Sequence, residues 1–196
     1  MQRTLFHRIT IGLGAIAAAV VVAAAAISLP GSGTGSAATP NSVVTADTHR
    51  AGQYSSLVLD ASGFPVISYS ASANDSTASV RVMHCNDANC AGGDEATFTL
   101  ETDDPSATSL ALDSNGFPVV AMDAAPNTLR ILHCNDANCA GNDEAVTNPD
   151  TDFNFGATLL PSLILDGNGF PVIAYVRTGG ALYLMHCNDA NCAGGD

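Results

Sequence analysis

Apolar and polar residues follow one another in short blocks along most of this chain, and the same order of blocks occurs three times. An apolar run leads into a turn of the form Asp-x-x-Gly-Phe-Pro, a second apolar run, a variable polar loop and a third apolar run. The repeats begin SLVLDASGFPVISY at Ser56, SLALDSNGFPVVAM at Ser109 and SLILDGNGFPVIAY at Ser162. Short runs of Val, Ile and Leu between Gly, Asn, Asp and Pro predict antiparallel hairpins, and nothing after residue 40 has helical periodicity.

A cysteine-rich element follows the third apolar run of each repeat. It reads HCNDANCAGGD from His84, HCNDANCAGND from His133 and HCNDANCAGGD from His186. In two repeats a weaker fourth run comes next, EATFTLET from Glu95 and EAVTNPD from Glu144. Each repeat is therefore predicted to hold four strands, with one turn at Asp-x-x-Gly and another at the cysteine element.

Both faces of these predicted strands are apolar. In the first strand Leu57 and Leu59 point to one face and Val58 to the other. A sheet with one face in water would alternate apolar with polar residues. Sheets that are apolar on both faces are expected to stack, and stacked four-stranded units of this length are typical of β-propeller blades.

The predicted fold class is therefore all-β: a β-propeller-like array of about three four-stranded antiparallel blades, after an N-terminal signal or anchor helix. Propellers usually have four to eight blades, so we expect an open arc or a fragment of a longer array. The expected divisions are a signal peptide or membrane anchor at 1–38, a linker with a possible closing strand at 39–55, and repeats at 56–108, 109–161 and, truncated, 162–196.

The stretch NSVVTADTHR from Asn41 is the candidate closing strand. Val44 precedes Leu57 by about the distance at which Phe98 precedes Leu110. We expect this stretch to supply the fourth strand of the last blade, as in the strand exchange that closes many propellers.

The first 38 residues have the layout of an export signal. Arg3 and Arg8 precede an apolar run at 11–29, Pro30 ends it, and small residues follow with a plausible cleavage site at 36–38. The run is also close to the length that spans a bilayer, so a retained anchor is the alternative. Both readings place the rest of the chain outside the cytoplasm, secreted or on the extracytoplasmic face of the membrane.

The charge of the chain restricts the classes of molecule that it is expected to bind. Of 196 residues, 19 are acidic and 6 are basic, for a formal net charge of -13. Nucleic acid would be repelled, and a membrane contact is expected only through 11–29 if that run is not cleaved.

The six cysteines are expected to form three local disulfides. In an exporting context cysteines pair, and turn-favouring residues separate the two cysteines of each repeat. Closing so small a loop contributes about 2 kcal/mol. A zinc site is one alternative, but the spacing of the two cysteines is unusual for zinc, and each repeat offers three ligands where zinc prefers four. A redox-active pair is another, but it would need the spacing Cys-x-x-Cys. The expected pairs are Cys85–Cys90, Cys134–Cys139 and Cys187–Cys192.

The other repeated polar residues are expected to serve the scaffold. The histidines at the ends of the third strands are predicted to bind a neighbouring loop, and the turn aspartates to accept backbone N–H bonds. Calcium is a weaker reading of the oxygen-rich loop at Asp87, Asn89, Asp94 and Glu95, because the EF-hand spacing is absent. The scaffold residues are His84, His133, His186, Asp60, Gly63, Asp113, Gly116, Asp166 and Gly169.

The unit His-Cys-Asn-Asp-x-x-Cys-x-Gly-Gly-Asp/Glu resembles that of bacterial exported tandem-repeat proteins. The resemblance covers 56–196 and implies a propeller-like fold, but it implies no activity. The Asp-x-x-Gly turns are also similar to the Asp-box hairpins of sialidases, although only the Asp and Gly positions agree.

Three functions fit the sequence. The first is a non-catalytic exported or cell-surface module that binds a protein or carbohydrate, without a cofactor. The second is an exported propeller-type hydrolase or lyase, similar to a sialidase and lacking its remaining blades. Its candidate site residues, which break the repeat symmetry, would be Arg177, Asp123, Tyr183 and His49; they form no recognisable set. The third is a structural spacer. Self-association through open blade edges is expected with any of them.

Overall fold

A computed structural model of the chain describes residues 43–48, 51–74, 77–101, 107–124, 128–151, 160–177 and 179–194. The chain divides into two compact units, 1–32 and 33–196, and every described residue belongs to the second. The signal or anchor helix expected within 1–38 thus lies outside the described residues. Among the residues that are described, no helix is long and apolar enough to cross a membrane.

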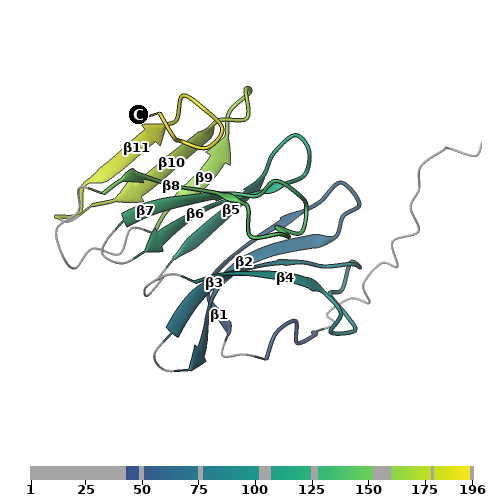
Figure 1. Cartoon of the computed structure of the whole chain (residues 1–196). Helices are drawn as coiled ribbons and strands as arrows, with labels where there is room; N and C mark the ends of the chain where they lie inside the picture. The colour runs from purple at the N-terminus through teal and green to yellow at the C-terminus, as the bar shows by residue number, and fades with distance from the viewer. Residues whose placement is uncertain are drawn as a thin grey trace, which may run out of the picture. The chain divides into compact units, whose positions relative to one another are not determined.

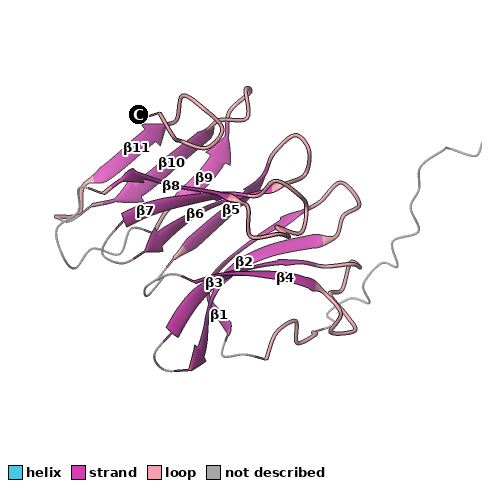
Figure 2. Ribbon diagram, viewed as in Figure 1, coloured by secondary structure: helices cyan, strands magenta, loops and turns pink. Residues whose placement is uncertain are grey.

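The described part of the second unit is built from three antiparallel sheets and contains no helix, as Figures 1 and 2 show. Two sheets have four strands, in the orders β1-β2-β3-β4 and β5-β6-β7-β8, and the third has three, in the order β11-β10-β9. None of them is closed. The strands are β1 (Ala51–Leu59), β2 (Pro65–Asn74), β3 (Thr77–His84), β4 (Ala96–Glu101), β5 (Thr108–Leu112), β6 (Pro118–Ala124), β7 (Thr128–His133), β8 (Ala145–Asp150), β9 (Ser162–Leu165), β10 (Pro171–Val176) and β11 (Leu182–His186).

Each sheet corresponds to one predicted repeat, and the strands follow one another as hairpins. Proline opens β2, β6 and β10, because its missing N–H is tolerated at the first residue of a strand. The pairing registers of equivalent strands agree: Val66 faces His84 in the first sheet, as Val119 faces His133 in the second. For the described residues the all-β fold is thus confirmed, as are four strands in the first two repeats, while the third repeat, predicted to be truncated, has three.

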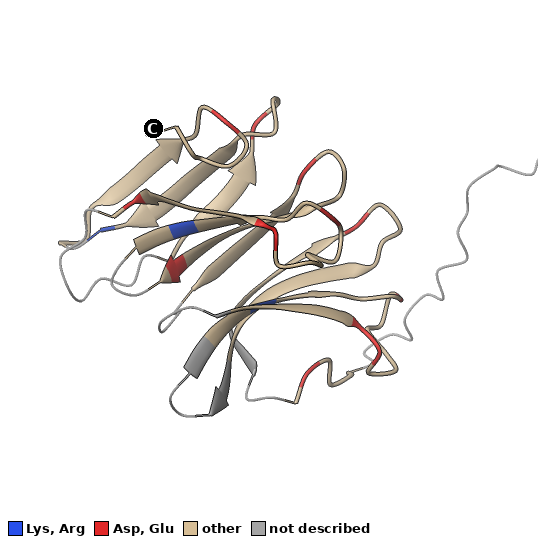
Figure 3. Ribbon diagram, viewed as in Figure 1, with Lys and Arg blue, Asp and Glu red and all other residues tan. Residues whose placement is uncertain are grey.

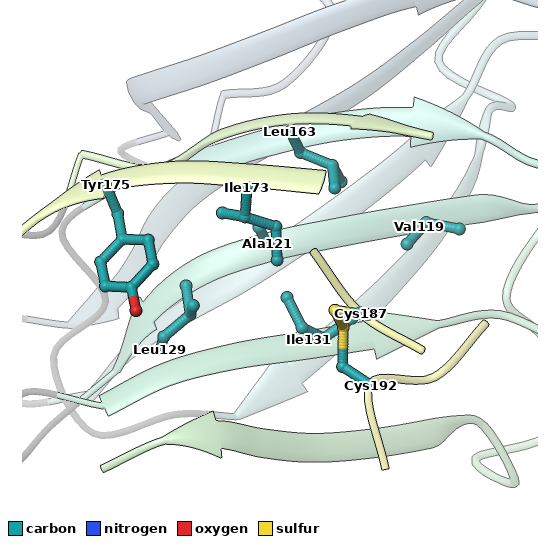
Figure 4. Close-up of a cluster of buried hydrophobic side chains, with 9 residues drawn as sticks. All are labelled: Val119, Ala121, Leu129, Ile131, Leu163, Ile173, Tyr175, Cys187 and Cys192. Carbon is teal, nitrogen blue, oxygen red and sulfur yellow. A yellow bond between two sulfur atoms is a disulfide. The ribbon is translucent and has the colours of Figure 1, made fainter. Parts of the chain in front are cut away.

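The faces of consecutive sheets bury each other through apolar side chains. One cluster joins Val66, Val80 and Val82 of the first sheet to Val120 and Met122 of the second. An equivalent cluster joins the second sheet to the third (Figure 4), and its members are Val119, Ala121, Leu129, Ile131, Leu163, Ile173, Tyr175, Cys187 and Cys192. Strand β6 is buried along its whole length because it is central in its sheet and covered on both faces.

Polar contacts also join the first strands of consecutive repeats. The Leu110 N–H donates to Ser56 Oγ at 3.0 Å, and the Leu163 N–H donates to Ser109 Oγ at 2.9 Å. Both serines stand at the first position of the repeated line. The repeat therefore specifies both the strands and the bonds that position one sheet on the next.

The amino-terminal stretch differs from the expectation. Residues 43–48 form no strand, and the third sheet has no strand from this region. Instead Ala46 packs on the first sheet beside Tyr69 and Met83. Strand β1 begins at Ala51, inside the stretch expected to be a linker.

Candidate functional site

The Asp-x-x-Gly turn has the same hydrogen bonds in all three repeats. In the first, Asp60 Oδ1 accepts from the N–H groups of Ser62 and Phe64 at 2.8 Å each, and the Gly63 N–H donates to Asp60 O at 3.0 Å. The glycine has a φ of 81°, which residues with a Cβ rarely adopt. One carboxylate oxygen of the aspartate thus accepts the backbone N–H bonds within its own turn. The other oxygen is not used in the turn.

The six cysteines form three disulfides within the repeats: Cys85–Cys90, Cys134–Cys139 and Cys187–Cys192. The Cα atoms of the first pair are 4.9 Å apart, within the ordinary range for a bridge. The bridges are buried, and the second and third lie within the apolar clusters between sheets. Each therefore closes its own loop, and the second and third also pack against the preceding sheet, while the first lies with Tyr69 and Met83 on the first sheet. Three such bridges indicate an oxidising environment.

In the first two repeats a histidine joins the Asp turn to the cysteine loop of the next repeat, an arrangement called here the histidine clasp. His84 Nε2 lies 3.1 Å from Asp60 Oδ2 in its own repeat. Its Nδ1 lies 2.9 Å from Ala137 O and 3.1 Å from Asn138 Oδ1, in the cysteine loop of the second repeat. One imidazole ring thus connects two loops of its own sheet with a loop of the following one.

The second clasp repeats the first. His133 Nε2 lies 3.4 Å from Asp113 Oδ2, and Nδ1 lies 3.0 Å from Ala190 O and 2.8 Å from Asn191 Oδ1. Both ring nitrogens therefore face oxygen atoms, Nε2 that of its own Asp turn and Nδ1 those of the following cysteine loop.

His186 makes only the first half of the clasp with the described residues. Its Nε2 lies 2.9 Å from Asp166 Oδ2. Its side chain is 58% exposed, whereas those of His84 and His133 are 15% and 14% exposed. No described cysteine loop follows to cover its Nδ1.

The clasp carboxylates are held in the ionised form. Partial burial raises the pKa of Asp60, but hydrogen bonds from Phe64, His84 and Ser62 outweigh it, so the pKa lies below its ordinary value. The pKa of Asp113 is lowered by equivalent bonds against the same opposing burial. For Asp166 the bonds from Phe170 and His186 lower the pKa to about 2.

The acidic residues weighed for calcium hold the cysteine loop together. Asp87 Oδ1 accepts from the Asn89 N–H at 2.6 Å, and Glu95 Oε2 accepts from the Asn86 N–H at 2.7 Å. Asp94 lies in the same loop, next to Gly92. The described residues include no group of three or more His, Cys, Asp or Glu placed to hold a metal ion. Figure 3 shows that the described acidic residues lie mainly in turns and loops.

Two of the four symmetry-breaking residues lie together. The Arg177 guanidinium lies over the Tyr183 ring, 4.4 Å from its centroid, and donates to Asp150 at the end of β8. The Tyr175 hydroxyl donates to the same carboxylate at 2.5 Å, and burial together with this carboxylate raises the pKa of Tyr175 to about 12. Asp123 lies elsewhere, buried in β6, and His49 lies outside the described residues.

The arginines of the described repeats have separate partners. Arg81 donates to Asp47 at 2.9 Å, Arg130 to Asn148 at 3.0 Å, and Arg177 to Asp150.

A second carboxylate contact between segments was missed by the sequence reasoning. Asp47 Oδ2 accepts from the Tyr69 hydroxyl at 2.8 Å as well as from Arg81. Its signal was present in the sequence, because NSVVTAD from Asn41 aligns with EAVTNPD from Glu144 and brings Asp47 level with Asp150. The two aspartates bind tyrosines at equivalent positions of β2 and β10.

These contacts assign the repeated Asp, His and Cys residues to the connections within and between sheets. No model of a known protein family matches the chain, and no curated protein is significantly similar to it.

Proposed function

We propose that this chain is a non-catalytic, propeller-like repeat module that is exported or held at the cell surface and binds a protein or a carbohydrate. The observation that carries the proposal is the use of the repeated reactive side chains. The Asp and His residues form clasps in the first two repeats and the first half of a clasp in the third, and the described Cys residues are paired. Groups with equivalent structural contacts in successive repeats serve stability, since a catalytic pocket needs unlike groups from different repeats.

Export is supported by the three disulfides and by the signal-like sequence at 1–38. The propeller-like arrangement is supported by the burial of both faces of the second sheet between its neighbours. Such a scaffold suits recognition, because binding residues are commonly carried on loops that a rigid framework positions.

The loops proposed for binding are the connections from β2 to β3, β6 to β7 and β10 to β11. They differ in length and sequence, whereas the Asp turns and cysteine loops scarcely vary. Because consecutive strands are antiparallel, the last residues of β2, β6 and β10 lie at the opposite end of their sheets from the cysteine loops. Variation there changes the ligand-facing surface and leaves the clasps intact.

The test is a glycan array probed with the oxidised full chain, with product release measured on every glycan that binds. Binding without product is the expected result. Exchanging the connection of β2 and β3 for that of β6 and β7 should change the glycans bound. As the matched control, exchanging residues 61–62 of the first Asp turn for 114–115 of the second should leave the glycans bound unchanged.

A protein ligand is tested by photo-crosslinking at the cell surface from a probe residue in the β6–β7 connection. A probe in the second cysteine loop is the control. Crosslinks from the connection alone support the proposal. Glycan cleavage would support the hydrolase or lyase instead, and absence of both binding and crosslinks would favour a spacer.

A further inference from the structure

Positions that are buried between consecutive sheets are exposed at the two ends of the array. Leu110 and Leu163 are 4% and 6% exposed, whereas Leu57, their equivalent in the first repeat, is 57% exposed. At the other end, Leu184 is 74% exposed, whereas its equivalent Ile131 is 1% exposed. The ends therefore present the two halves of the contact that joins the sheets internally.

We name these surfaces the leading face and the trailing face. The leading face is the side of the first sheet with Leu57, Leu59 and Ile67 and the loop closed by Cys85–Cys90. The trailing face is the side of the third sheet with Ile164, Leu182 and Leu184. Inside the array the equivalents of a trailing face and a leading face pack against each other twice.

Residues 43–48 already lie where the fourth strand of a preceding repeat would lie. The end of β8 reaches the third sheet through Asp150, which binds Tyr175. Asp47 binds the equivalent Tyr69 on the first sheet. Ala46 packs on the first sheet, as its sequence equivalent Leu100 of β4 packs on the second.

The third sheet offers a matching edge for that segment. In the first two sheets the third strand is paired with a fourth, β3 with β4 and β7 with β8. Beside β11 lies a groove of about 480 Å³, lined by Leu184, Met185 and His186 and by the end of β8. A strand placed there would have the position of β8 beside β7.

We propose that a second copy of this chain docks head to tail, with its leading face on the trailing face of the first copy. Residues 43–48 of one copy then pair with β11 of the other as its fourth strand. His186 completes its clasp with Ala88 O and Asn89 Oδ1, the equivalents of Ala137 and Asn138. The two faces already have the form found at the internal junctions, and residues 43–48 become a strand on pairing.

Two copies satisfy both ends of the array. A head-to-tail contact is heterologous, so it either closes into a ring or continues as a filament. Two copies supply six sheets, within the four to eight of closed propellers. Burial of the exposed leucines favours docking and opposes the repulsion between two chains of charge -13.

The test is native mass spectrometry of the full chain, kept in a mild detergent because of the apolar run at 11–29. The chain is studied at about 50 µM, above the Kd of about 1 µM that the weaker interfaces of standard size reach. Two copies per complex are expected. Leu57→Asp and Leu184→Asp should each leave single copies, while Val146→Asp, an exposed position outside both faces, should leave the complex intact.

Mixing the two variants separates this arrangement from others. One variant is labelled with ¹⁵N. A complex of one labelled and one unlabelled copy should form, because the trailing face of Leu57→Asp and the leading face of Leu184→Asp are both intact. His186 should become protected from diethyl pyrocarbonate in the wild-type complex and react freely in Leu184→Asp. A wild-type chain that stays single, or a Leu57→Asp variant that still pairs, overturns the proposal. Circular dichroism confirms that each variant is folded.

Discussion

At the scale of single residues, the two glycines of the third Asp turn have different conformations. Gly169 has a φ of 83°, whereas Gly167 lies outside the left-handed region, and neither has atoms within 4 Å of an added Cβ. Gly169→Ala should lower the free energy of unfolding by about 1–2 kcal/mol, since a Cβ disfavours positive φ. Gly167→Ala should raise it by about 0.4–1 kcal/mol by restricting the unfolded chain. Urea denaturation of both variants measures the difference, and equal losses would contradict the assignment.

The turn aspartates make stability depend on acid. The pKa values of Asp60 and Asp113 are lowered in the folded state, and that of Asp166 is lowered to about 2. Their contribution is therefore complete above the unfolded value of about 3.9 and is lost as the pH falls through the folded values. We expect the free energy of unfolding to decrease between about pH 4 and pH 2.

Asp113→Asn is the variant that checks this dependence. It removes one titrating carboxylate from a partly buried clasp, so the decrease on acidification should be smaller than in the wild type. Denaturant titrations at a series of pH values measure it. An acid dependence unchanged by the substitution would show that Asp113 does not contribute.

At the scale of the elements, the chain contains its own control for the histidine clasp. His133 contacts Asp113 and the third cysteine loop, whereas His186 contacts Asp166 and is largely exposed. His133→Ala should cost about 1–3 kcal/mol because it leaves partly buried acceptors unpaired. His186→Ala should cost less than about 0.5 kcal/mol, as surface substitutions usually do. The comparison uses chemical denaturation at a concentration low enough to keep the chain as a single copy.

The strands and turns were largely predictable because the same sequence pattern occurs three times in the chain. Successive side chains of a strand point to opposite faces, so continuous apolar runs predicted that both faces are apolar. The turn residues marked the hairpins, and local rules were therefore sufficient. The local part of the site, the Asp turns and the disulfide loops, followed from the same rules. The loop bonded by His84 could be expected only in kind, because its partner Ala137 is 53 residues away and belongs to another sheet.

Other contacts depended on how the sheets stack. Asp60 was expected to bind backbone N–H groups, but its second oxygen binds His84, 24 residues away. Asp47 was placed with the last repeat by its spacing, and in the structure it binds the first sheet. Spacing shows that the stretch from Asn41 is equivalent to a fourth strand, but it does not show which sheet that stretch will contact.

At the scale of the whole molecule, protection of the backbone should vary systematically from the second sheet to the edge of the third. Strand β6 is buried throughout, while β11 is exposed over most of its length. Amide hydrogen exchange should therefore be slowest in β6 and fastest in β11 when the chain is a single copy. Exchange measured by mass spectrometry on overlapping peptides tests this order. Equal protection in the two strands would mean that β11 is covered.

The direction of the clasp has a consequence for biosynthesis. Asp60 and His84 belong to one repeat, but the loop that they receive is made later, in the next one. When the chain emerges from its amino end, Asp60 and His84 are therefore present before the loop that His84 binds. If folding follows that order, each later repeat stabilises the one before it, and the last repeat to fold is the least stabilised.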